Sequence, residues 1–296
     1  MTQPTDTSHR VRQITWAGIW VNVLLTVAKI FAGIFGHSRA LIADGVESGM
    51  DIITSSVLLV GSRFWSAPPD AEHPYGHKRI ETIITLGIGL VVGLVGLSIL
   101  WNALTSIHGG EHTHPTLIAL VVAIGTVIAK ELLYRWSDRE GRKIRSMSVV
   151  ANAWHHRSDA ISSIPVVLSV GAAQLVPSWT FLDAVGAMIA SGFILKASFE
   201  ILWPALREMA DTGVTADTVN KLQAIATSVD GVRSLHDIRT RYVGGSSIHV
   251  DLHVVVNPDM TVMESHHIGD EVAARLKAEG PDVLDVLVHI DPGPDM

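Results

Sequence analysis

The sequence predicts an α-helical membrane protein with six transmembrane helices, followed by a C-terminal cytoplasmic α/β domain. Acidic and basic residues gather toward the C-terminus, so we expect a membrane transport domain over 1–210 and a soluble metal-sensing and dimerisation domain over 211–296. The first part contains apolar stretches that are each long enough to cross a bilayer. They run over about residues 14–36, 40–63, 80–106, 115–136, 148–174 and 179–203.

Two of these stretches carry further structural signals. Gly89 and Gly93 lie four residues apart in the third stretch, a spacing that lets membrane helices approach closely. Pro165 lies inside the fifth stretch and should kink that helix, because proline lacks the backbone N–H and its ring clashes with the preceding turn.

The basic residues of the short loops predict the orientation. Lys and Arg gather before the first stretch, after the second and after the fourth, whereas the opposite side carries only Arg39. The positive-inside rule therefore places both termini in the cytoplasm. We expect the protein to lie in the cell inner membrane.

The tail has the pattern of a small two-layer domain with the element order αββαβ. Gly244 and Gly245 separate two strand-like runs and indicate a hairpin. Helical spacing of apolar residues and a possible cap at Thr215 or Asp217 predict the flanking helices. The expected elements are a helix over 217–229, strands over 232–243 and 247–256, a helix over 260–277 and a strand over 282–290.

Composition limits the chemistry. The chain has no cysteine, which excludes disulfides, thiolate zinc sites and thiol catalysis. Metal binding would have to use carboxylates and the 15 histidines. The chain has a net charge of −7 and no polybasic run, which argues against nucleic acid as a partner.

Ionisable residues inside the apolar stretches indicate a metal pathway. Asp44, Glu47 and Asp51 recur at helical spacing and share one helix face, and His155 and Asp159 share a face of another helix. Such residues are expensive within a bilayer and usually line an ion path. Two helices that each offer two ligands one turn apart can close a four-coordinate site with nitrogen and oxygen donors. The alternative is interhelical hydrogen bonding, but that is typical of Ser, Thr, Asn and Gln.

Four stretches, in this order, resemble the cation diffusion facilitator family of divalent metal transporters. They are LIADGVESGMDIITS at 41–55, HPYGHKRIE at 73–81, HHRSDAISS at 155–163 and VLVHIDP at 286–292. The resemblance covers nearly the whole chain. It implies a homodimer of six-helix protomers in a lipid bilayer, which exports a divalent cation from the cytoplasm in exchange for protons and is not an enzyme.

The resemblance also implies a transport site made by Glu47, Asp51, His155 and Asp159, with Asp44 supporting these ligands from one turn away. Glu47 departs from the family, in which zinc carriers generally have His or Asp at that position. An alternative is that Glu47 points away and Asp44 supplies the fourth ligand. We expect Zn²⁺ as the transported and regulatory metal, because a tetrahedral set of His and carboxylates suits it, with Fe²⁺, Mn²⁺ and Co²⁺ left open.

The resemblance implies three further features. Asp70, His73 and His77 match a second metal site in a cytoplasmic loop, and Arg79 and Asp211 match a pair that interlocks the helices. The family's cytoplasmic metal site, expected to sense metal and tighten the dimer, corresponds to His236, His253, His266, His289 and Asp291. The alternative for both metal sites is a set of solvated surface histidines.

Two other function classes are alternatives to a transporter. An intramembrane metalloprotease would need a His-Glu-x-x-His type of zinc helix, and His155-His156-Arg157-Ser158-Asp159 lacks it. A metal-responsive membrane scaffold with little flux would present the same binding sites, so the sequence leaves that alternative open.

Overall fold

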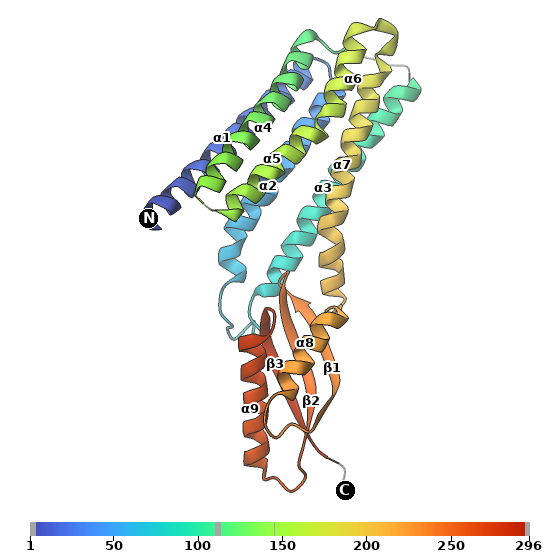
Figure 1. The fold of residues 1–296 in the computed structure, drawn as a ribbon. Coiled ribbons are helices and arrows are strands. Elements are labelled where there is room, and N and C mark those ends of the chain that lie inside the picture. Colours follow the sequence, from blue (N-terminus) through green and yellow to red (C-terminus); the bar gives the residue numbers. More distant parts are fainter. Residues whose placement is uncertain (1–3, 110–113, 145, 294–296) are drawn as a thin grey trace. The chain divides into compact units, whose positions relative to one another are not determined.

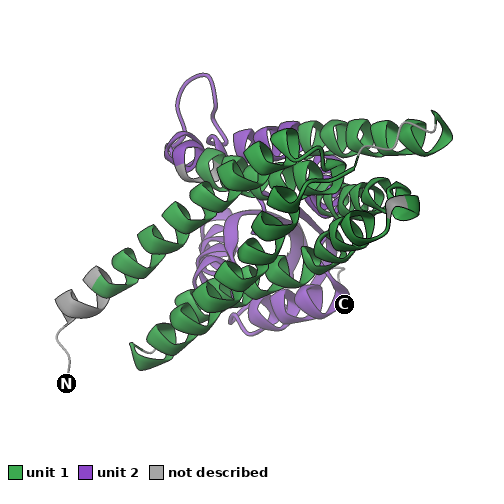
Figure 2. Cartoon of the chain, turned by 90° about the horizontal axis from the view of Figure 1, so that it is seen from above, with its two compact units in different colours: residues 1–59, 89–199 green, residues 60–88, 200–296 purple. Residues whose placement is uncertain are grey.

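The computed structural model describes residues 4–109, 114–144 and 146–293 (Figure 1). Contacts between Cα atoms divide the chain into two compact units (Figure 2). Unit 1 contains residues 1–59 and 89–199, and unit 2 contains residues 60–88 and 200–296. Three long helices therefore begin in one unit and end in the other. The domain boundary expected between residues 210 and 211 stays a prediction.

Long helices form the N-terminal two thirds of the chain. Among the described residues, five helical spans are long and apolar enough to cross a membrane: 10–35, 78–109, 117–143, 147–175 and 181–209. The second long helix, α2, has 27 residues and carries the three carboxylates Asp44, Glu47 and Asp51. Together these spans confirm the predicted membrane fold. The helices are α1 (Pro4–Phe35), α2 (Arg39–Trp65), α3 (Lys78–Gly109), α4 (Leu117–Lys143), α5 (Met147–Ser162), α6 (Ile164–Leu175), the short 3₁₀ helix η1 (Pro177–Trp179) and α7 (Phe181–Met209).

Apolar side chains cover much of the outside of these helices. On α3, Leu90, Leu94, Leu97 and Trp101 are all exposed. A helix that is apolar on all sides is typical of a membrane span. This outward apolar surface is therefore the surface that a lipid bilayer would cover.

The fifth span is broken where the proline predicted it. Helix α5 ends at Ser162, α6 begins at Ile164, and Pro165 occupies the first turn of α6. Proline is tolerated there because the first N–H groups of a helix have no intrahelical acceptor. The break thus ends α5 one turn after Asp159.

The glycines of α3 allow a close approach to α7. A Cβ atom at Gly93 would lie 2.7 Å from Ser198 Oγ, a distance that real Cβ contacts do not show. Ser198 Oγ donates a hydrogen bond of 2.8 Å to the carbonyl oxygen of Gly89. The pair of glycines therefore packs two helices and also frees an acceptor between them.

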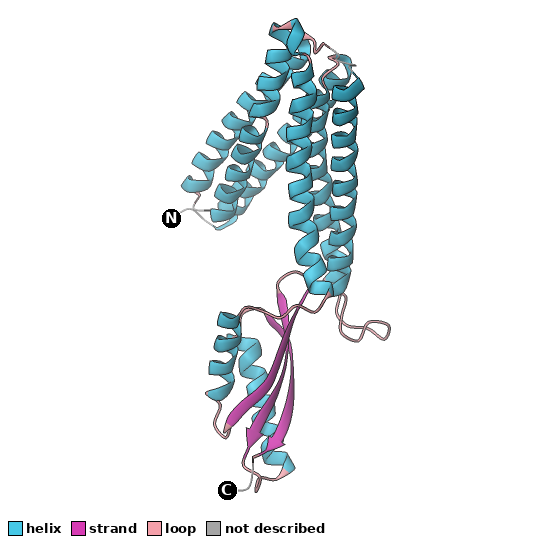
Figure 3. Ribbon diagram, turned by 90° about the vertical axis from the view of Figure 1, so that its right-hand side faces the viewer, coloured by secondary structure: helices cyan, strands magenta, loops and turns pink. Residues whose placement is uncertain are grey.

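The tail has the predicted αββαβ order: α8 (Ala216–Thr227), β1 (Ser234–Val243), β2 (Ser247–Val256), α9 (Val262–Glu279) and β3 (Val283–Pro292). The strand order is β1-β2-β3, antiparallel between β1 and β2 and parallel between β2 and β3. Both helices pack on one face of the sheet (Figure 3), where Leu222, Ala226, Val272 and Leu276 meet the alternate residues of β2. Thr261 and Glu264 form a capping box that starts α9.

Candidate metal centres

Three of the four expected transport ligands converge inside unit 1. Asp51 of α2 and His155 and Asp159 of α5 each offer one ligand atom, and these atoms all lie within 4.8 Å of one another. His155 Nδ1 is 3.9 Å from Asp159 Oδ1, as the one-turn spacing of these residues requires. One imidazole nitrogen and two carboxylate oxygens form a donor set that suits a divalent transition metal.

This group lines a cavity of about 260 Å³. The cavity is polar where the ligands converge, because Ser48, Lys130, Asn152 and His156 line it as well. His156 Nε2 lies 3.2 Å from Asn152 Nδ2, one turn away on α5. The site therefore has room for a hydrated ion and polar groups around it.

Glu47 does not belong to the group of atoms within 4.8 Å. It is half-buried one turn before Asp51 on α2. Its role as the fourth ligand stays a prediction. Asp44, the alternative fourth ligand, is 2 % exposed and has both carboxylate oxygens occupied: Lys29 Nζ lies 2.8 Å from Oδ2, and Ser163 Oγ donates to Oδ1 over 2.7 Å.

Two lysines that the sequence reasoning left without a role lie among these carboxylates. Lys29 of α1 is fully buried and pairs with Asp44. Lys130 of α4 is nearly as buried, and its Nζ donates to Asp159 Oδ2 over 3.0 Å. Both ammonium groups also reach Ser48 Oγ, at 3.1 and 3.5 Å. The signal in the sequence was a single lysine within each of two otherwise apolar spans, which calls for a buried partner.

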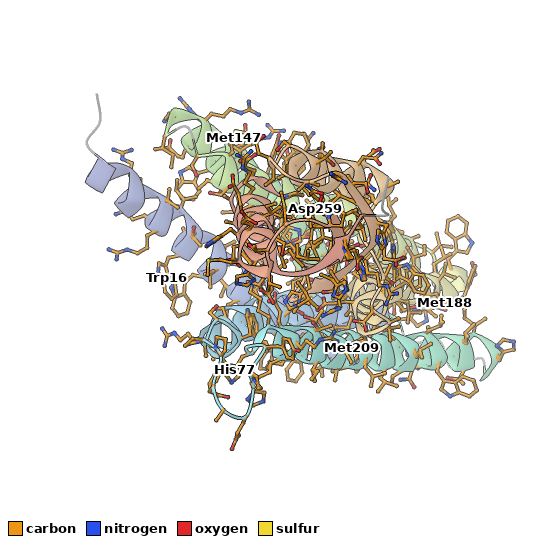
Figure 4. The ribbon with its side chains drawn as sticks, turned by 90° about the horizontal axis from the view of Figure 1, so that it is seen from below. Trp16, His77, Met147, Met188, Met209 and Asp259 are labelled. Carbon is orange, nitrogen blue, oxygen red and sulfur yellow. The ribbon has the colours of Figure 1, made fainter. Side chains whose placement is uncertain are left out.

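The loop between α2 and α3 brings together Asp70, His73 and His77. Asp70 Oδ1 is 3.4 Å from His73 Nδ1, and Asp70 Oδ2 is 3.3 Å from His77 Nε2. The backbone N–H of His73 donates to Asp70 over 2.7 Å, and this bond is the main cause of the lowered pKa of that carboxyl group. His77 is labelled in Figure 4. An ionised carboxylate and two imidazoles at these distances suit a zinc ion.

The tail aligns three histidines across its three strands. His236 of β1 is paired in register with His253 of β2, and His253 with His289 of β3. The Asp291 carboxylate lies 3.0, 2.8 and 3.2 Å from nitrogens of these three rings. The hydrogen bond with His253 is the main cause that lowers the pKa of Asp291. His236, His253 and Asp291 are close enough to hold one ion.

His266 lies apart from this group. It is on α9, where its Nε2 is 3.5 Å from Asp270 Oδ2. The buried residues Leu252 and Val254 of β2 face the helices, so His253 between them faces the other side of the sheet. Helix and histidine row are thus on opposite faces of the same protomer. The assignment of His266 to the tail site stays a prediction.

Arg79 and Asp211 form an ion pair within unit 2. Arg79 Nη2 donates to Asp211 Oδ1 over 2.8 Å, and both side chains are exposed. Asp211 has a φ of 52°, a left-handed conformation in which Asp is among the more tolerant residues. The contact joins the start of α3 to the segment after α7. Its role as an interlock stays a prediction.

Family models match both parts of the chain. The cation efflux transmembrane domain matches residues 15–210, and the cytoplasmic domain of cation efflux proteins matches residues 214–293. The chain belongs to the cation diffusion facilitator family. Members of this family carry divalent metal cations across membranes and are not enzymes, so this chain is a membrane-embedded metal transporter.

Relatives within the family have different named metals. Metal tolerance protein C1 of Arabidopsis thaliana is 36% identical over 291 residues, which are 93% of this chain and 61% of that protein. The manganese efflux system protein MneS of Bacillus subtilis is 34% identical and is covered to 91%, as is this chain. The magnetosome protein MamB of Magnetospira sp. is 29% identical over 95% of this chain and 94% of its own length.

Solved structures of the MamM C-terminal domain (CTD) resemble the tail. One variant is 30% identical and covers 26% of this chain and 95% of its own, with a TM-score of 0.25 over the whole chain.

Proposed function

We propose that this chain exports Zn²⁺ from the cytoplasm in exchange for protons, as a homodimer in the cell inner membrane. The observation that supports the site is the convergence of Asp51, His155 and Asp159 on one cavity inside a helix bundle. In this proposal, Glu47 completes the set. The loop residues Asp70, His73 and His77 and the tail residues His236, His253, His266, His289 and Asp291 bind regulatory metal.

Exchange for protons follows from the chemistry of the ligands. A metal ion needs deprotonated carboxylates and a neutral imidazole, so protons and metal compete for the same atoms. His155 suits this exchange because imidazole changes its charge near neutral pH. Reorientation of the bundle would then expose the site outward, where protons replace the ion.

Manganese is the second candidate cargo. Its support is the relative named as a manganese efflux protein, together with a donor set that is mostly oxygen. A site with one imidazole and two or three carboxylates does not strongly favour zinc over harder divalent ions, and Fe²⁺ and Co²⁺ belong to the same group.

The test is flux into proteoliposomes with an imposed proton gradient, measured for zinc and manganese in separate experiments. The purified chain should accumulate zinc, and collapse of the gradient should stop the accumulation. Asp51→Ala and Asp159→Ala should each abolish flux, because the ion loses a ligand and a neutralising charge in a low-dielectric site. Parental flux in both variants would refute this site, and binding without any flux would favour the scaffold alternative.

A further inference from the structure

The Lys130 side chain reaches into the group of expected transport ligands from α4. It is 3% exposed, and its Nζ donates to Asp159 Oδ2 over 3.0 Å. Lys130 also lines the cavity that Asp51, His155 and Asp159 line. The ammonium group therefore already neutralises one of the carboxylates that a metal ion would need.

A metal ion and this ammonium group are competitors by charge. In a site shielded from water, a divalent cation on Asp159 would be repelled strongly by an ammonium group on the same carboxylate. Lys130 must leave Asp159 before the carboxylate can bind a metal ion. Ser48 Oγ, which is 3.5 Å from Lys130 Nζ, is a second acceptor within reach of a small movement.

The neighbouring Lys29 differs from Lys130 in this respect. Its Nζ is 2.8 Å from Asp44 Oδ2, and Ser163 Oγ donates to the other oxygen of Asp44. Lys29 and Asp44 thus form a closed buried pair beside the site. Asp44 cannot neutralise Lys130 as well, which leaves Asp159 as the carboxylate that holds Lys130.

We propose that Lys130 is a tethered competitor of the transported metal. It holds Asp159 when the site carries no ion, and the arriving ion displaces it. The inference rests on the proposed transport site. A carrier that must reorient without cargo would otherwise hold an uncompensated carboxylate in a low-dielectric interior, which is costly. The same competition weakens metal binding enough for the ion to be released.

Two variants of Lys130 should change metal affinity in opposite directions. Lys130→Met removes the competing charge at similar side-chain length, so zinc should bind about tenfold or more tightly. Lys130→Arg should weaken zinc binding, because a guanidinium can hold a carboxylate through two parallel hydrogen bonds. A lysine that only supports the fold predicts the contrary pattern: weaker or unchanged binding in Lys130→Met and nearly parental binding in Lys130→Arg.

The measurement is zinc affinity of the purified full-length chain at one fixed pH, by competition with a chromophoric chelator. The background carries His73→Ala, His77→Ala, His236→Ala and His289→Ala, so that the loop and tail sites are removed. In proteoliposomes, Lys130→Met should lower both the apparent KM and the maximal rate, since a tightly held ion leaves slowly. A structural defect would lower the maximal rate without lowering KM.

The outcomes separate this inference from the proposed function. If Asp51→Ala leaves the remaining zinc binding intact, the transport site itself is wrong, and the inference with it. If Asp51→Ala abolishes that binding but Lys130→Met does not tighten it, the inference alone is refuted. If Lys130→Met does not fold, unchanged or tighter binding by Lys130→Arg refutes it.

A measurement on the parental chain decides if neither variant folds. Zinc should raise the acetylation of Lys130 by a small amine reagent, because the displaced ammonium is no longer held by Asp159. The exposed Lys221 of α8 serves as the internal reference in the same mass spectrum. Zinc-independent acetylation of Lys130 would refute the displacement.

Discussion

The buried pair between Lys29 and Asp44 should stabilise the helix bundle strongly. Both residues are at most 2% exposed, and their charged atoms are 2.8 Å apart. Asp44→Asn keeps the shape of the side chain and its hydrogen-bonding capacity but removes its charge. It would leave the Lys29 ammonium without a neutralising partner inside the bundle.

The expected cost follows from this geometry. Two unit charges 2.8 Å apart attract each other by about 6 kcal/mol at an effective dielectric constant of about 20. Desolvation offsets much of that attraction in the intact pair, but removal of one partner of a buried pair typically costs about 3–5 kcal/mol. The substituted amide can still accept a hydrogen bond, so we expect about 3 kcal/mol, or a fall of about 10 °C in the unfolding midpoint.

The assay is thermal unfolding of the full-length chain in detergent at one scan rate, followed by the fluorescence of its 8 tryptophans. Glu131→Gln is the matched control, because Glu131 pairs with Arg135 at 2.7 Å on the exposed surface of α4. An exposed pair contributes at most about 1 kcal/mol, so this variant should melt close to the parent. The double variant Lys29→Met with Asp44→Asn removes both charges and should regain most of the loss.

Two results would refute the reasoning. If Asp44→Asn melts with Glu131→Gln, the buried pair does not stabilise the bundle. If the double variant melts as low as Asp44→Asn, the loss does not come from an unpaired Lys29.

Four other predictions follow from the site, the loops and the packing. Glu47→His should narrow the transported set toward zinc and Glu47→Ala should lower the flux of every metal; unchanged rates for zinc, iron(II) and manganese in both variants would exclude Glu47 as a ligand. In intact cells, a cysteine at His114 should react with an impermeant thiol reagent and one at Arg139 should not, and the reverse labelling would contradict cytoplasmic termini. The lowered pKa of Asp291 means that its contribution to tail stability is present above the ordinary carboxyl pKa and is lost only as the pH falls through the lower folded value; zinc loss by an Asp51→Ala chain near pH 6 should therefore follow the histidines, and Asp291→Asn should weaken zinc binding at pH 7 without moving that midpoint. Gly93→Ala should destabilise the chain by about 1–2 kcal/mol through its clash with Ser198, whereas Gly87→Ala on the same helix meets nothing within 4 Å and should be neutral or stabilising, so equal melting of the two would contradict the close packing.

Periodicity predicted the elements well because each signal lies within one segment. The tail strand expected over 247–256 has these bounds in the structure, and the helix break before Pro165 is where the missing N–H requires it. Helical spacing also brought His155 and Asp159 onto one face. These predictions needed no knowledge of which helices are neighbours.

The partners of the two buried lysines could not be predicted in the same way. Lys29 and Asp44 are 15 residues apart on different helices, and Lys130 and Asp159 are 29 apart. Their pairing depends on how α1, α2, α4 and α5 pack, which a single sequence does not encode as a local pattern. His266 illustrates the same limit, because strand alternation alone does not tell which face of the sheet the helices cover.

The three aligned histidines of the tail make metal binding depend on correct strand pairing. A shift of β1 or β3 by one residue would turn its histidine toward the face that α8 and α9 cover. Only the native pairing presents His236, His253 and Asp291 together. A metal ion bound there would therefore act as a proofreader during folding, since it would stabilise the correctly paired sheet and none of the slipped ones.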